Sequence, residues 1–290
     1  MPSTRDIRRR IKSVKNTAQI TKAMQMVASS KMRRAQLAAV SGRPYAELMN
    51  AVLGDAAASA TDFSHPLMEK RPVKKRAVIL VSTDKGLCGA LNANLTREAA
   101  KLDKDTTVFV AAGKKGAQFL SRTKRQLAAE FTYKDAPLFM EARAISKFVQ
   151  EMFLKGEVDC VDVLFTNFIS TLVQKLETKA LLPVGHITGF RTSVKQLETE
   201  LKPSGIEFQF EPGADAVLGQ LLPHYLNFQI FQILLEAKAS EHSSRMVAMK
   251  NATDNAKQLI KDLTLEYNKL RQANITKELL EITTAQMALG

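Results

Sequence analysis

Tryptophan is absent from this sequence, and only two of its 290 residues are cysteine. Two thiols, Cys88 and Cys160, cannot form a disulfide framework or a four-ligand zinc site, and we expect both to be small, reduced core residues. The four histidines are widely scattered, and none stands three or four residues from another. The sequence therefore predicts neither a metal site nor a resident cofactor.

Long apolar runs are also absent. No stretch approaches the roughly eighteen uninterrupted apolar residues of a membrane span, so we expect no direct membrane span. The first twenty residues are rich in Arg and Lys but hold no apolar signal core, which argues against a secretory signal and for a cytosolic compartment. An organelle transit peptide has a similar composition, but a helical period fits these residues better.

No Ser/His/Asp set, Cys/His set or recognisable pair of carboxylates predicts a catalytic site.

Negative charge is scarce at the start of the chain. The net charge is +13, and residues 1–43 carry eleven basic side chains against a single acid, Asp6. Such a balance demands an acidic partner, for which nucleic acid is the usual first hypothesis. However, residues 1–43 contain no aromatic side chain that could stack on bases. An acidic protein surface and a merely solvated helix face remain alternatives to nucleic acid.

The first segment, from about Thr4 to Ser41, contains neither Pro nor Gly. Its apolar and small residues recur at alternating spacings of four and three, which predicts a long helix with a heptad-like stripe. Small residues dominate the second half of that stripe and would let a second helix approach closely. We expect Ile20, Met24 and Val27 to broaden the apolar face. The stripe comprises Ile7, Ile11, Val14, Ala18, Thr21, Gln25, Ala28, Met32, Ala35 and Ala39.

The middle of the chain alternates short β-branched runs with helical patterns. We predict strands at Ala77–Ser82, Thr106–Ala111, Val158–Phe165 and Leu176–Leu182, with a possible further strand at Ile206–Phe210. We predict helices at Leu87–Leu102, Lys114–Thr123 and Leu138–Lys155. This alternation is typical of a small α/β domain with a mostly parallel, Rossmann-like sheet.

The last segment, residues 224–289, contains neither Gly nor Pro, and Pro223 stands where the first helical residue is expected. A continuous helix of this length would span roughly 100 Å, whereas a compact protein of this size is roughly 50 Å across. We therefore predict that the helix protrudes and buries its stripe against the N-terminal helix, as an antiparallel coiled coil. The α/β domain is then inserted between the paired ends. The C-terminal helix should run on beyond its partner and end in an uncharged tip that another protein surrounds.

The predicted organisation is thus a coiled-coil helix at 1–56, a linker at 57–75, the α/β domain at 76–190, a connection at 191–222 and a second coiled-coil helix at 223–290. Two βα turns of the domain hold glycines. Ser82–Asn92 and Gly113–Gly116 occupy the position of phosphate-binding turns, but they match neither the dinucleotide fingerprint nor the P-loop. A structural role is favoured, and a nucleotide-binding enzyme remains the alternative.

Three segments carry a specific resemblance to a known family. Ile7–Gln36 (IRRRIKSVKNTAQITKAMQMVASSKMRRAQ), Val81–Asn92 (VSTDKGLCGALN) and Ser240–Ile282 are similar to the γ-subunit family of F-type ATP synthases, in its bacterial form. The resemblance covers essentially the whole chain. The tail after Glu281-Ile282 departs from the Gly/Ala-rich family pattern.

The resemblance implies a rotor shaft that couples proton movement to ATP synthesis and has no nucleotide site of its own. Its implied partners are the hexamer of α and β subunits, the ε subunit and the membrane c-ring, at the cytoplasmic face of the bacterial inner membrane. Nucleic acid is not among them. The implied contacts with the hexamer are made by Lys22, Lys31, Arg33, Arg34, Arg245, Arg271, Gln272, Thr276 and Leu279.

Overall fold

The computed structural model describes residues 3–42, 44–45, 48–49, 52–53, 65–184, 211 and 213–289. The chain divides into two compact units. Unit 1 combines Met1–Ala28 with Arg245–Gly290, and unit 2 comprises Ser29–Ser244. Two long helices, α1 (Thr4–Ser41) and α6 (Ala214–Leu289), each contribute to both units.

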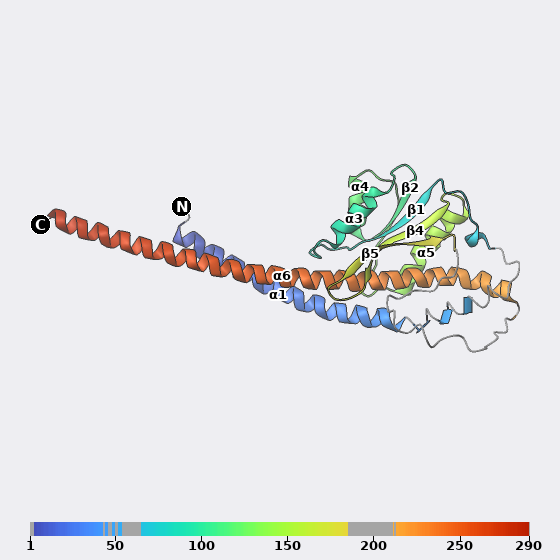
Figure 1. Cartoon of the computed structure of the whole chain (residues 1–290), viewed down its shortest axis with the longest axis horizontal. Helices are drawn as coiled ribbons and strands as arrows, with labels where there is room; N and C mark the ends of the chain where they lie inside the picture. The colour runs from blue at the N-terminus through green and yellow to red at the C-terminus, as the bar shows by residue number, and fades with distance from the viewer. Residues whose placement is uncertain are drawn as a thin grey trace. The chain divides into compact units, whose positions relative to one another are not determined.

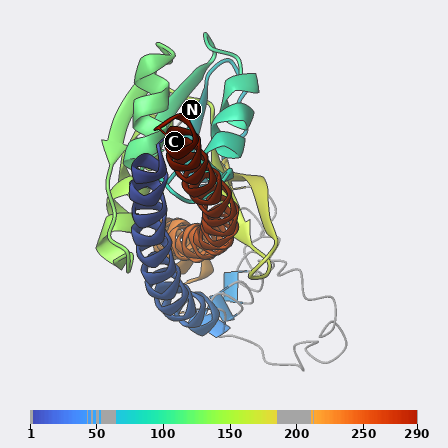
Figure 2. The ribbon, with the colours of Figure 1, turned by 90° about the vertical axis from the view of Figure 1, so that its left-hand side faces the viewer.

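Unit 1 is a pair of helical segments from opposite ends of the chain, which lie side by side in Figures 1 and 2. Ile7 and Ala28 of α1 are buried, as are Met249, Ala256 and Leu263 of α6. The hydroxyls of Thr21 and Thr253 are 2.7 Å apart in this interface, and Arg8 donates to the Tyr267 hydroxyl. The predicted pairing of the two ends as a coiled coil is therefore confirmed.

The stripe predicted on α1 is correct at each of its ten positions, since every one is buried or half-buried. Within unit 1, Ile20 and Val27 do not broaden the apolar face as we expected, because they are 60% and 56% exposed. Their helical positions lie too far around α1 from Thr21 and Ala28 to reach the partner helix.

Unit 2 is built on a five-stranded sheet in the order β3-β2-β1-β4-β5. The strands are β1 (Arg76–Val81), β2 (Thr107–Ala112), β3 (Leu127–Phe131), β4 (Cys160–Phe168) and β5 (Gln174–Leu182). Strands β1 to β4 pair in parallel, whereas β5 pairs with β4 in the antiparallel sense. The mostly parallel sheet that the sequence predicts is thus confirmed.

Helices cover both faces of this sheet (Figure 1). On one face, α3 (Leu91–Lys101) and α4 (Lys114–Arg122) pack on alternate residues of the strands, including Leu80 and Phe109. On the other face, α5 (Phe139–Leu154) and α6 residues 218–237 pack on the remaining ones, including Ile79 and Val163. Because both faces are covered, the central strands are almost continuously apolar. A short 3-10 helix, η1 (Pro66–Met68), adds Leu67 to this second core.

Two features of unit 2 differ from the sequence prediction. Strand β3 was not predicted, because Leu127–Phe131 (LAAEF) is an alanine-containing edge strand with little β-branched character. Helix α6 begins at Ala214 and not at Pro223, which lies inside the helix. Pro223 removes one backbone hydrogen bond, but the buried Leu218, Leu222 and Leu226 hold the turns on either side against the core. The strand proposed at Ile206–Phe210 lies outside the described residues.

Within the described residues, no helix is both long and apolar enough to cross a membrane. In the same part of the chain, no cluster of three or more His, Cys, Asp or Glu side chains is arranged to hold a metal ion.

Candidate functional site

The N-terminus of α4 is the first place where an anionic ligand could bind, because helix N-termini attract phosphate. Its first four N–H groups, however, already donate within the protein. Lys114 donates to an Asp84 carboxylate oxygen at 3.0 Å, Lys115 to the Thr83 carbonyl at 3.0 Å and Gly116 to the Ser82 hydroxyl at 2.7 Å. The N–H of Ala117 donates to the Gly113 carbonyl. A phosphate would have to displace a carboxylate of the chain itself.

The glycines of this turn serve close packing. Gly113 has φ +110°, and a Cβ there would stand 2.2 Å from the Ser82 carbonyl oxygen. A Cβ on Gly116 would stand 2.8 Å from the Ser82 hydroxyl. In the neighbouring turn, Asn92 donates to the Thr83 hydroxyl at 2.7 Å and fixes the start of α3. The geometry therefore favours the structural role of both turns over nucleotide binding.

Six of the nine implied hexamer contacts lie in unit 1. Lys22, Arg271, Gln272 and Thr276 are exposed, and Arg245 is half-buried. Leu279, the sixth, is 58% exposed. Gln272, Thr276 and Leu279 follow one another at spacings of four and three, so they share one face of α6. The Thr276 hydroxyl donates back to the Gln272 carbonyl at 3.0 Å.

The other three implied contacts, Lys31, Arg33 and Arg34, lie on α1 in unit 2. Arg33 and Arg34 are exposed, and Arg34 donates to the Ser30 hydroxyl at 3.3 Å. Lys31 differs from them, because its ammonium is paired with the Asp135 carboxylate. A partner that uses Lys31 would have to compete with that intrachain ion pair.

The last part of α6 presents apolar side chains to solvent in unit 1. Every residue from 271 to 287 is exposed, including Ile275, Leu280, Ile282 and Met287. In Figure 1 this end of α6 continues past the start of α1. A run of exposed apolar residues on a helix marks a surface for another protein.

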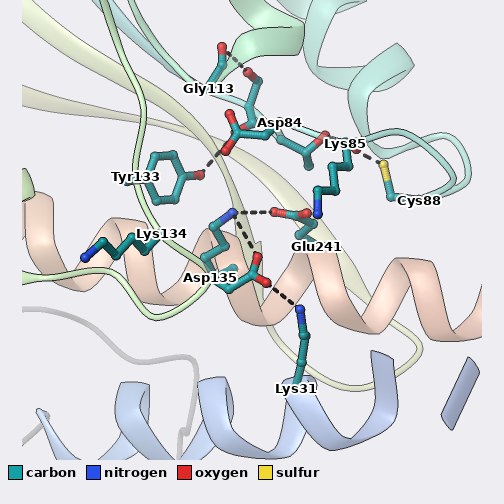
Figure 3. A network of polar contacts seen from close by, with 12 residues as sticks. Lys31, Asp84, Lys85, Cys88, Gly113, Tyr133, Lys134, Asp135 and Glu241 are labelled. Carbon is teal, nitrogen blue, oxygen red and sulfur yellow. Dashed lines mark hydrogen bonds and ion pairs between the residues drawn. The ribbon is translucent and has the colours of Figure 1, made fainter. Parts of the chain in front are cut away.

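A buried polar network in unit 2 was missed by sequence reasoning. Lys238 of α6 is 2% exposed, and its ammonium lies 3.0 Å from the Glu241 carboxylate and 3.9 Å from that of Asp135. The ammonium also stands 4.5 Å from the centre of the Tyr133 ring, whose hydroxyl donates to the Ser82 carbonyl. Figure 3 shows Asp135 between Lys31 and Glu241. The network joins α1, α6 and the loop after β3.

Charge and burial set the titration of this network. The hydrogen bond from Lys31 lowers the pKa of Asp135, and the charges of Lys31 and Lys238 lower it further. Burial raises the pKa of Tyr133 well above its usual range, and the nearby carboxylate of Glu241 adds to the shift. Both groups therefore stay in one charge state through the neutral range. The spacing of Lys238 and Glu241, three residues apart on a helix, was the one available signal in the sequence.

A cavity of about 360 Å³ opens beside this network. Ala35, Ala38, Phe231 and Leu235 contribute apolar walls, and Asp135 is among its polar lining residues. Its walls come from α1, α6 and the loop after β3, the same three elements that the network joins.

A family model described as ATP synthase matches residues 3–289. Among curated relatives, the ATP synthase gamma chain of Opitutus terrae is 49% identical, with 99% of each chain covered. That of Methylacidiphilum infernorum is 47% identical, with 100% of each chain covered. The chain therefore belongs to the ATP synthase gamma chain family. This confirms the resemblance drawn from Ile7–Gln36, Val81–Asn92 and Ser240–Ile282.

Solved structures share the fold at lower identity. In the rotational state 3 structure of Euglena gracilis mitochondrial ATP synthase, one chain matches with a TM-score of 0.69 at 19% identity, over 99% of this chain and 94% of that chain. A chain from the central stalk and c-ring structure of the Tetrahymena thermophila mitochondrial enzyme matches with a TM-score of 0.61 at 24% identity, over 80% of this chain and 99% of that chain.

Proposed function

We propose that this chain is the central rotor shaft of an F-type ATP synthase and couples ion translocation to ATP synthesis or hydrolysis. The observation that carries the proposal is the exposed final part of α6 in unit 1, residues 271–287. These residues form a helix with exposed Leu279, Leu280 and Ile282, as expected for a shaft end enclosed by a partner. The family membership of the chain and the central-stalk structures that share its fold support the same function.

The geometry suits this function because two paired helices present different side chains in different directions. Chemically identical catalytic subunits around such a shaft each meet a different face of it. A binding partner can shift a conformational equilibrium only by its differential affinity for the two states. Taking a two-state catalytic site from 1:99 to 99:1 requires about 5.5 kcal/mol of that difference.

The contacts of the shaft with the α and β subunits are proposed to be the nine residues placed above. Four of the cationic ones, Lys22, Arg33, Arg34 and Arg271, are exposed and suit acidic loops of the catalytic subunits. The face shared by Gln272, Thr276 and Leu279 supplies polar and apolar contacts at the end of the shaft.

The remaining features of the proposal concern the rest of the complex. The α/β domain, residues 76–190, rests with the foot of the coil on the c-ring and binds the ε subunit, at the cytoplasmic face of the inner membrane. The chain contributes no catalytic site, and catalysis belongs to the β subunits. At the N-terminus of α4, the N–H groups already donate to Asp84, Thr83 and Ser82, which argues against a phosphate site at this turn.

The direct test is co-purification and coupling in the whole complex. Tagged chain is expected to bring down a stoichiometric α/β hexamer with ATPase activity, and inverted vesicles with the complete complex should pump protons on addition of ATP. Leu263→Pro, which breaks α6 at a buried position, should abolish assembly or pumping, whereas Lys261→Ala at an exposed neighbouring position should not.

Two outcomes would contradict the proposal. Normal coupled synthesis by the Leu263→Pro complex would show that an unbroken shaft is not needed. Micromolar binding of ATP, NAD or NADP to the isolated chain, measured by calorimetry, would revive the nucleotide-binding alternative.

A further inference from the structure

Helix α6 carries an unusual number of polar side chains into the interior of unit 2. Several of these side chains contact other elements, and we name five of them the α6 belt: Gln232, Lys238, Ser240, Ser243 and Ser244. All five lie within thirteen consecutive residues, about 18 Å along the helix. Gln232, Lys238, Ser240 and Ser243 are buried, in a stretch that is buried almost without interruption from Ile230 to Ser243.

One side of the belt is bonded to the β4–β5 hairpin. The Ser240 hydroxyl donates to the Thr166 carbonyl at 2.9 Å, and the Ser243 hydroxyl donates to the Thr171 carbonyl at 2.6 Å. The Ser244 hydroxyl donates to the side-chain oxygen of Gln174 at 3.0 Å. These three serines therefore attach α6 to β4, to the loop after it and to β5.

The other side of the belt is bonded to the loop after β3 and to α1. Lys238 pairs with Asp135, which in turn pairs with Lys31 of α1. Gln232 points about 120° away from Lys238 on the helix, and its side-chain amide donates to the Ala39 carbonyl of α1 at 3.1 Å. Residues two positions apart on a helix point about 200° apart, so Lys238 and Ser240 face nearly opposite directions. The belt thus holds α6 from two sides.

This arrangement resists twisting in a way that apolar packing does not. Apolar burial is non-directional, so the core around Ile233 and Leu234 opposes separation more than rotation. Hydrogen bonds weaken steeply with distance and angle. A rotation of α6 by about 20° would move a side-chain tip at a radius of about 5 Å by about 1.7 Å. That displacement would break the hydrogen bonds of the belt together.

We propose that the α6 belt, with Lys238 as a positioning residue, fixes α6 against twisting in unit 2 and so sets the torsional stiffness of the shaft. The proposal rests on the proposed function as a rotor. Torque that enters the α/β domain reaches the continuous helix α6 through these bonds. The burial of a lysine charge fits this role, since buried ion pairs contribute little net stability but can fix a unique arrangement.

The decisive variant removes the buried charge pair while it keeps the volume of the side chains. Lys238→Met/Glu241→Leu should leave the urea midpoint of the isolated chain close to that of the wild type, because apolar replacements of a buried pair are tolerated. The matched control is Asp254→Leu/Lys257→Met. It removes an exposed ion pair on the same helix whose partners are also three residues apart in the sequence, with 3.5 Å between the ammonium and the carboxylate. Asp135→Asn is a milder third variant at a half-exposed position.

The measurement is the angular fluctuation of a bead on the c-ring of a surface-fixed complete complex at rest. Torsional stiffness is inversely proportional to the variance of that angle. We expect the variance to rise about twofold in the Lys238→Met/Glu241→Leu complex, and less in the Asp135→Asn complex, because the ion pair that ties Lys238 to Asp135 on one side of α6 is lost or weakened. The control variance and the ATPase rate without load should remain at wild-type values.

A variance in the double variant equal to that of the control would overturn the proposal. If the double variant does not assemble, a wild-type variance in the Asp135→Asn complex would overturn it equally. Failure of the proposed function would be visible earlier, as a wild-type chain that does not join the hexamer or does not rotate relative to it.

Discussion

The two leucines Leu263 and Leu279 of α6 offer a direct test of how the shaft helix is covered in unit 1. Leu263 is 6% exposed and Leu279 is 58% exposed. Leu→Ala removes three carbon atoms, worth about 2.4 kcal/mol of transfer free energy at a fully buried site. With the cavity left behind, Leu263→Ala should cost about 3 kcal/mol. Leu279→Ala should cost about 1 kcal/mol or less in the isolated chain, because less than half of its surface is lost from water on folding.

Urea unfolding of the isolated chain, followed by the circular dichroism signal of its helices, measures the loss of unfolding free energy in each variant. The comparison holds where the m-value is unchanged. In the assembled complex Leu279 should matter more than its small stability cost in the isolated chain suggests, since its exposed face is the one proposed to meet the hexamer. There Leu279→Ala should weaken ATP-driven proton pumping more than its small effect on stability explains. Equal destabilisation of the isolated chain by the two substitutions would refute the reasoning, because it would mean that residue 279 is already covered.

Three further predictions concern unit 2. Gly113→Ala should destabilise it by about 3 kcal/mol or more in urea unfolding, because the φ of +110° and the Ser82 carbonyl both oppose a Cβ; Gly156→Ala, with φ +73° and open space, should cost only about 1 kcal/mol. Because the pKa of Asp135 is lowered in the folded state, its ionised carboxylate stabilises the fold at any pH above the pKa of an unfolded carboxyl group. Asp135→Asn should therefore reduce the free energy of unfolding by its full amount at neutral pH. That difference should disappear as the pH falls through the folded pKa, and a difference that did not change with pH would contradict the ion pair. Burial lowers the pKa of Lys179, so wild-type stability should rise with pH toward the usual lysine range, and Lys179→Met should remove that rise.

Much of the fold could be predicted because its signals are local. The heptad-like spacing from Ile7 to Ala39 depends only on helical geometry, and the structure buries or half-buries each of those residues. The β-branched runs of β1, β2 and β4 are predictable for the same reason, since strands buried on both faces are apolar throughout. Strand β3 lacks this composition and is a strand only because β2 offers it an edge. The start of α6 was misplaced because tertiary packing tolerates Pro223.

The polar contacts were beyond the reach of sequence reasoning. Lys238 carries no local mark that separates it from an exposed helix lysine such as Lys257. Its burial depends on Asp135 and Tyr133, which lie about a hundred residues away in the sequence. The same limit applies to the N-terminus of α4, where the Asp84 carboxylate accepts from the Lys114 N–H at the place that a phosphate would take. To predict such polar contacts, one must know how several helices, strands and loops are positioned against one another, and local sequence patterns do not give those positions.

The pairing of the chain's two ends has a consequence for its biosynthesis. Arg8 and Tyr267, which bond in unit 1, are 259 positions apart in the sequence. A ribosome adding roughly 5–20 residues per second needs on the order of ten seconds to a minute to cover that distance. Throughout that time the apolar stripe that begins at Ile7 has no C-terminal partner. The same helix carries an excess of basic residues, and repulsion between like charges opposes association of such segments while they wait for their partner.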